Sequence, residues 1–191
     1  MALTRITSRV IGANTISASA IADGSITSAK LASGAARANM GSGTVLQVVQ
    51  KIFGDVTTTT SVNTFVDVTN GYLAITPVAS NSKFLVRVLG QGYQSAGAGM
   101  NLGLSRVIGG TTTRLLGTDG TGGNSWMGAG NGPSNTSYTI LREYLDSPNV
   151  AAGTPVTYKM LVALWSGATA VYLNYSGYSP ESMITIEEIA G

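Results

Sequence analysis

The sequence predicts an all-β protein, a sandwich or jelly roll preceded by an extended N-terminal segment of short repeats. Three observations support this fold class. From residue 42 onward, segments rich in Val, Ile, Leu and Thr alternate with turns rich in Gly, Asn and Ser, and no segment has a convincing helical period. The first forty residues instead follow a ten-residue repeat. Charged residues make up only 10% of the 191-residue chain, so uncharged polar residues and glycine must cover most of its surface.

The N-terminal repeat places two large aliphatic residues in every ten. Its rows are ITSRVIGANT, ISASAIADGS and ITSAKLASGA, and their aliphatic positions are Ile6, Ile11, Ile16, Ile21, Ile26 and Leu31. Burying two such side chains contributes about 3–6 kcal/mol, whereas ordering ten backbone residues costs about 10–20 kcal/mol. One chain therefore cannot order this segment, and we expect the six residues to pack in a stem of several chains or against a partner surface. The alternative is a flexible tail rich in Ala, Ser and Gly.

The body of the chain is predicted to contain eight to ten strands, and two glycine-containing dipeptides predict hairpin turns between them. Asn70-Gly71 and Gly109-Gly110 are the two turn signals. The segment 57–61 is a polar link, and both faces of 154–167 are largely apolar, which places that strand at the centre of a sheet. The predicted strands are residues 42–53, 63–69, 72–77, 82–93, 101–108, 112–117, 137–146, 154–167, 169–177 and 182–191.

A long loop is predicted at residues 117–137, which are almost all turn-forming residues. Loops longer than about 12–15 residues are usually functional or disordered. Trp126 lies in this loop with Asn124 and Met127 near it. An aromatic ring beside an amide suits stacking on a carbohydrate or contact with a protein, so these three residues are the candidate receptor or partner contacts. The alternative is that Trp126 folds back and covers the end of the domain.

The composition argues against several classes of function. The chain has no Cys and no His, which removes disulfides, zinc sites of the Cys/His kind and the commonest nucleophiles and general base. Glu187 and Glu188 are neighbours, but neighbouring strand residues point to opposite faces, so we expect an edge or rim position and not a catalytic pair. Asp55, Asp67 and Asp146 are isolated in the sequence. We therefore expect no enzyme, no metal and no cofactor.

Charge and hydropathy set further expectations about partners. The net charge is +2, and the basic residues are scattered instead of clustered, so we expect no nucleic-acid partner. No apolar run reaches the 18 or more residues of a membrane span, so we expect no membrane insertion. The N-terminus MALTRITSRV lacks an apolar core of signal-peptide length, which predicts a protein made in a cytoplasm and not exported by that route.

The repeat DGSITSAKLASGA, residues 23–35, resembles the short repeats in the N-terminal stems of bacteriophage tail fibres and other virion fibres. The runs FVDVTNGYLAITP, SKFLV, REYLDSP and ITIEEIAG resemble the compact knob domains of tail-fibre and head-fibre proteins. The strand layout is also similar to the jelly rolls of the tumour-necrosis-factor and C1q type, which trimerise through apolar sheet faces.

These resemblances imply a virion protein with an anchor or stem at residues 1–41 and a β-sandwich knob at residues 42–191. The implied protein is a homotrimer, assembled in the cytoplasm of a bacterial host, whose residues 1–41 bind other virion proteins of the tail or capsid. It would act as a tail fibre or attachment protein that displays the knob to a glycan or protein of the host surface. One alternative is a head fibre or capsid decoration protein anchored to the shell by its N-terminus. Another is a small phage glycan hydrolase, for which the sequence offers no carboxylate pair.

Overall fold

The structure of the protein, a computed structural model, describes residues 18–23, 25–26, 41–94, 99–117, 126–127, 136–165, 170–175, 177 and 181–191. The chain divides into two units, Met1–Asn39 and Met40–Gly191. In the described part of the first unit, η1 (Ala18–Ala20) is a single turn of 3-10 helix. No helix in the described ranges is long and apolar enough to cross a membrane.

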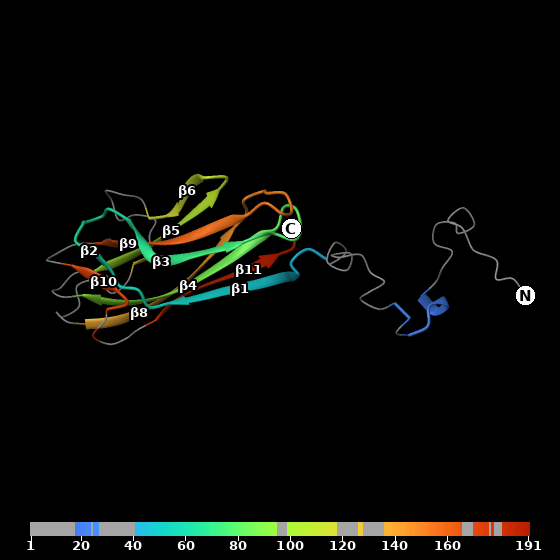
Figure 1. Ribbon diagram of the computed structural model, residues 1–191, viewed down its shortest axis with the longest axis horizontal. Coiled ribbons are helices and arrows are strands. Elements are labelled where there is room, and N and C mark those ends of the chain that lie inside the picture. The colour runs from blue at the N-terminus through green and yellow to red at the C-terminus, as the bar shows by residue number, and fades with distance from the viewer. Residues whose placement is uncertain are drawn as a thin grey trace, which may run out of the picture. The chain divides into compact units, whose positions relative to one another are not determined.

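The second unit is built from antiparallel β-strands (Figure 1). The strands in the described ranges are β1 (Val45–Phe53), β2 (Thr57–Thr59), β3 (Val66–Ile75), β4 (Lys83–Gln94), β5 (Met100–Ile108), β6 (Thr111–Leu116), β7 (Trp126–Met127), β8 (Thr136–Asp146), β9 (Val156–Leu164), β10 (Val171–Leu173) and β11 (Ser182–Ile189).

The strands form two sheets with the strand order of a jelly roll. The first, called the β4 sheet, has the order β1-β11-β4-β8, and β10 and β2 extend it. Strand β8 pairs with one side of β4 along nearly its whole length. On the other side of β4, β11 pairs with residues 83–89 and β10 pairs with residues 92–94. The second, called the β9 sheet, has the order β3-β9-β5-β6, with β7 also paired to β5. The chain passes repeatedly from one sheet to the other, and this connection pattern confirms the predicted all-β jelly-roll sandwich.

The core lies between the two sheets and follows the alternation of the strands. In β4, Phe84, Val86 and Val88 are buried, while the intervening Leu85, Arg87 and Leu89 are only partly covered. Strand β9 lies between β3 and β5 and buries side chains on both faces, which confirms its predicted central position. The period-2 pattern that predicted β4 therefore places one apolar face of this strand in the core and its other face on the outside of the sandwich.

The predicted hairpin at Asn70-Gly71 is wrong, because both residues lie inside β3. Asp67 pairs with Leu161 and Tyr72 pairs with Lys159, so residues 68–71 form a bulge opposite a single residue of β9. A type I′ hairpin requires positive φ at both central residues, and of the two only Asn70 has it, with φ of 55°. The chain therefore does not turn back at the bulge, and β3 pairs with β9 on both sides of it.

The second predicted hairpin is confirmed: Gly109 and Gly110, with φ of 54° and 82°, join β5 to β6. The polar link predicted at 57–61 contains a short strand, β2, which pairs with β10. Sequence reasoning missed it because three threonines carry no apolar alternation. Within the predicted loop 117–137, the structure describes Gly117, the strand β7 and the start of β8.

Candidate interaction surface

The outer face of the β4 sheet, which points away from the core, carries two rows of apolar side chains. Val48 and Ile52 of β1 and Leu141 and Leu145 of β8 each expose 54–56% of their surface. Strand pairing aligns them across the sheet, because directly paired residues share a face. In the first row, Val48, Leu85 and Leu145 are apolar and Glu187 of β11 interrupts them. The second row is apolar throughout and consists of Ile52, Met183, Leu89 and Leu141.

A polar row lies between these two apolar rows. Arg87 Nε donates to Glu143 Oε1 at 2.6 Å, and Arg87 Nη1 also pairs with Glu187. The hydrogen bond to Glu143, aided by the charge and hydrogen bond of Glu187, raises the pKa of Arg87 above its ordinary value. Beside them Gln50 Nε2 donates to Thr185 Oγ1 at 3.1 Å. The charges of this row are therefore paired within one chain, which lowers the cost of covering the face.

An aromatic cluster extends the same face toward the other end of β4. Tyr93 follows the outward alternation of Leu89 and pairs with Tyr172 of β10. The Tyr93 and Tyr175 rings are stacked with centroids 4.3 Å apart, and Tyr172 lies 5.9 Å from Tyr93 and 5.2 Å from Tyr175. Tyr172 and Tyr175 therefore pack against each other and against Tyr93, while Tyr178 lies outside the described residues.

The structure describes only part of the residues predicted to bind partners. Ile21 and Ile26 of the repeat are exposed, and Ile6, Ile11, Ile16 and Leu31 lie outside the described residues. Trp126 and Met127 form β7 and pair with Leu102 and Asn101 of β5. Asn124 lies outside the described residues, as do the side-chain environments of Trp126 and Met127. The stem and receptor-loop assignments therefore stay predictions.

Glu187 and Glu188 point to opposite faces, as predicted, but the expected edge or rim position is wrong. Their strand, β11, lies between β1 and β4. Glu188 is fully buried, and its carboxylate accepts hydrogen bonds from the side chains of Gln47 and Ser82 at 2.6 and 2.7 Å. It also accepts from the backbone N–H groups of residues 78 and 79. This carboxylate fixes the turn between β3 and β4, a role that depends on contacts across about 110 residues of chain.

Asp146, isolated in the sequence, joins the two sheets through a buried polar network. Arg106 Nη1 donates to both of its carboxylate oxygens at 2.7 and 2.8 Å, and the Tyr158 hydroxyl donates at 2.7 Å. Burial, with the hydrogen bond to Asp146, raises the pKa of Tyr158 far above its ordinary value. Asp146 belongs to β8, whereas Arg106 and Tyr158 belong to β5 and β9. In the described part of the chain, no group of three or more acidic residues could hold a metal ion.

No protein-family model matches the sequence, and no curated protein matches it. Solved structures with a similar fold include Eiger TNF from S. frugiperda, with 12% identity, a TM-score of 0.35, and coverage of 66% of this chain and 90% of that one. Another is the infectious bursal disease virus VP2 subviral particle, with 11% identity, a TM-score of 0.40 and coverage of 75% of this chain. The aligned region spans 38% of the VP2 chain. The structure of the infectious bursal disease virus Gx strain matches with 13% identity, a TM-score of 0.38 and coverage of 76% and 37%.

Proposed function

We propose that the chain is a virion structural protein that forms a homotrimer through the outer face of its β4 sheet and displays its jelly roll on a particle. The observation that carries the proposal is the pair of exposed apolar rows on this face. Monomeric proteins rarely expose contiguous apolar patches larger than a few hundred Å² unless the patch is functional. A face that already pairs its own charges suits contact with copies of itself.

The energy available from this face is enough to matter for association. Val48, Ile52, Leu141 and Leu145 each expose about half of their surface. Full burial of one such side chain contributes about 1.5–3 kcal/mol, so covering the four exposed parts contributes about 3–6 kcal/mol per protomer. The partly covered Leu85, Leu89 and Met183 add to this. The number of three subunits comes from the resemblance to trimeric jelly rolls and fibres.

The proposed place in the particle is a tail fibre or attachment protein that presents the knob to a host surface. The support is the ten-residue repeat at the N-terminus, which resembles fibre stems and whose aliphatic residues need neighbouring chains or a partner surface for burial. Three knobs on one stem would act together, because linked weak contacts bind at high effective concentration. No catalysis is part of the proposal.

The anchor is tested by substituting aspartate at two aliphatic positions of the repeat. Ile16→Asp with Ile26→Asp should remove the protein from purified particles while its circular dichroism spectrum stays that of a β protein. The matched control, Ser8→Asp with Ser28→Asp, adds the same charge at polar positions of the same repeat and should be incorporated normally. Normal incorporation of the isoleucine variant would rule out the anchor. Antibody labelling of particles in electron micrographs then separates the two locations: label on the tail supports an attachment fibre, and label on the shell supports a head fibre or decoration protein.

A further inference from the structure

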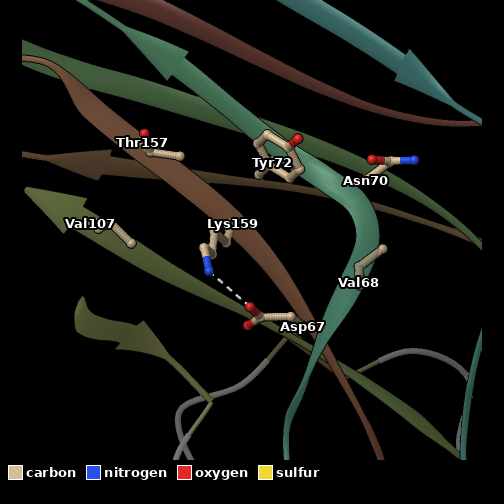
Figure 2. Close-up of a pocket in the computed structure, with 7 residues that line it drawn as sticks. All are labelled: Asp67, Val68, Asn70, Tyr72, Val107, Thr157 and Lys159. Carbon is tan, nitrogen blue, oxygen red and sulfur yellow. Dashed lines mark hydrogen bonds and ion pairs between the residues drawn. The ribbon is translucent and has the colours of Figure 1, made fainter. Parts of the chain in front are cut away.

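The outer face of the β9 sheet contains a groove with a volume of about 470 Å³. It lies on the side away from the core, because Tyr158 points inward between its two outward neighbours on β9. Figure 2 shows β5 and β9 side chains on one side of the groove and β3 side chains on the other. The lining residues are Asp67, Val68, Asn70, Tyr72, Val107, Thr157 and Lys159.

The bulge in β3 forms one side of this groove. Val68 and Asn70 line the groove within the bulge, where residues 68–71 face a single residue of β9. The bulge needs its sequence: Asn70 adopts a positive φ of 55°, which asparagine tolerates better than most residues. A Cβ at Gly71 would lie 2.6 Å from Val68 Cγ1, closer than packed atoms allow. The dipeptide that predicted a hairpin therefore forms part of the groove wall instead, and bulges are common at functional sites.

Tyr72 supplies an exposed aromatic ring held in place on one side. It exposes 49% of its surface. The Lys51 ammonium lies over the ring, 4.2 Å from its centroid. This cation–π contact occupies one face of the ring and stiffens the side chain. The opposite face is the one that a ligand in the groove can stack on.

The polar groups around the ring are held in fixed positions and include both donors and acceptors. Lys159 Nζ donates to Asp67 Oδ2 at 2.9 Å (Figure 2). Asn70 Nδ2 donates to Asp55 Oδ2 at 3.0 Å. Figure 2 shows the Asn70 carbonyl oxygen on the side of Tyr72 and the nitrogen on the side away from it. The groove thus offers carboxylate and amide oxygens as acceptors and the Lys159 ammonium and Thr157 hydroxyl as donors.

We propose that this groove binds a neutral saccharide. The formal charges of Asp55 and Asp67 cancel those of Lys51 and Lys159, so these four groups favour neither an anion nor a cation. A sugar ring combines an apolar C–H face, which fits Tyr72 and Val107, with hydroxyl groups that both donate and accept hydrogen bonds. The volume is in the lower part of the range for small-molecule sites, about 300–1,000 Å³. A nucleic-acid strand would need unpaired cations for its phosphates, and Lys159, the cation among the lining residues, is paired with Asp67.

Saccharide binding depends on the groove alone and not on the proposed virion role of the chain, so either proposal can fail without the other. It is tested with the full chain by saturation-transfer NMR and calorimetric titration. The probes are the methyl glycosides of glucose, galactose, mannose and N-acetylglucosamine, with N-acetylneuraminic acid and glucosamine as charged comparisons. At least one neutral glycoside should bind with a dissociation constant in the millimolar range, roughly 1–20 mM, as expected for one stacked ring and a few hydrogen bonds.

Matched variants locate the binding. Tyr72→Ala should weaken it about five- to tenfold, whereas Tyr72→Phe, which keeps the ring, should change it less than about threefold. Asp67→Asn, at an exposed position where folding is not threatened, should weaken it at least about threefold. Val62→Ala, an exposed position outside the groove lining, should leave it unchanged. The proposal is overturned if no neutral glycoside binds up to about 50 mM, if only the charged sugars bind, or if both Tyr72→Ala and Asp67→Asn bind like the wild type.

Discussion

Replacement of Leu141 and Leu145 by serine should weaken self-association of the protein strongly while the jelly roll stays folded. Both leucines lie on the outer face of β8, an outer strand of the β4 sheet, and each exposes 54% of its surface. Neighbouring Ile140 points into the core and is left untouched. The double variant therefore removes apolar surface from the proposed interface and little from the interior.

The expected magnitude follows from the exposed fractions. Fully burying one leucine contributes about 1.5–3 kcal/mol, so burying the exposed halves of both contributes about 2–3 kcal/mol per protomer. Loss of this term weakens each intersubunit contact about 30- to 160-fold. A trimer that is intact at micromolar concentration should then dissociate into monomers of 19.5 kDa over the same range.

Sedimentation velocity of the full chain over a dilution series measures this change. The matched control is Val62→Ser, because Val62 exposes 50% of its surface but lies outside the β4 sheet. Circular dichroism checks that all variants keep the β fold. If the double variant sediments like the wild type, or if Val62→Ser dissociates the protein equally, the outer face of the β4 sheet is not the interface.

Three further predictions concern the interior, each tested at one fixed protein concentration because the proposed association would contribute to stability. Asp146→Ala leaves the Arg106 guanidinium and the Tyr158 hydroxyl without their carboxylate acceptor, and it should lower the free energy of unfolding by about 3–5 kcal/mol. The control Asp67→Ala removes an exposed ion pair and should cost less than about 1 kcal/mol. Equal losses of the two variants in urea denaturation would contradict a stabilising role of the buried Asp146 network. Tyr158 has a raised pKa, so its share of the stability is complete below about pH 10 and declines at higher pH by up to about 1.4 kcal/mol per pH unit. The stability gap between wild type and Tyr158→Phe should accordingly narrow between pH 9 and 11, and a constant gap would refute this. Gly71→Ala forces a methyl group against Val68 and should destabilise by about 1–3 kcal/mol; an unchanged denaturation midpoint would show that the bulge relaxes freely.

Much of the fold could be predicted because its signals are local. The alternation in residues 82–93 corresponds to the inward and outward faces of β4, and the two-faced apolar pattern of 154–167 corresponds to the central strand β9. The Gly109-Gly110 hairpin likewise depends only on the φ angles of two glycines.

The Asn70-Gly71 prediction failed because a local turn preference competed with sheet pairing. Val68 is buried in the core and residues on both sides of the bulge pair with β9, so continuing the strand satisfies more of the backbone than reversing it. The groove beside Tyr72 exists only because of this outcome.

The two candidate surfaces and the buried carboxylates could not be predicted from spacing. Leu85, Leu145 and Val48 form one row only because β1, β11, β4 and β8 are neighbours, and strand order is set by the whole fold. Asp146 meets Arg106 across 40 residues, and Glu188 meets Val78 across 110. No periodic pattern in the sequence predicts pairings over such separations.

The most direct test of the central claim, the proposed virion role, is a cryo-electron microscopy map of purified virus or prophage particles in which mass spectrometry detects the chain. The account predicts jelly-roll density on the particle surface, in groups of three that cover the β4-sheet face carrying Leu141 and Val48, with residues 1–41 leading to the tail or shell. Particles that contain no such density, or that carry single knobs with this face open to solvent, would contradict it.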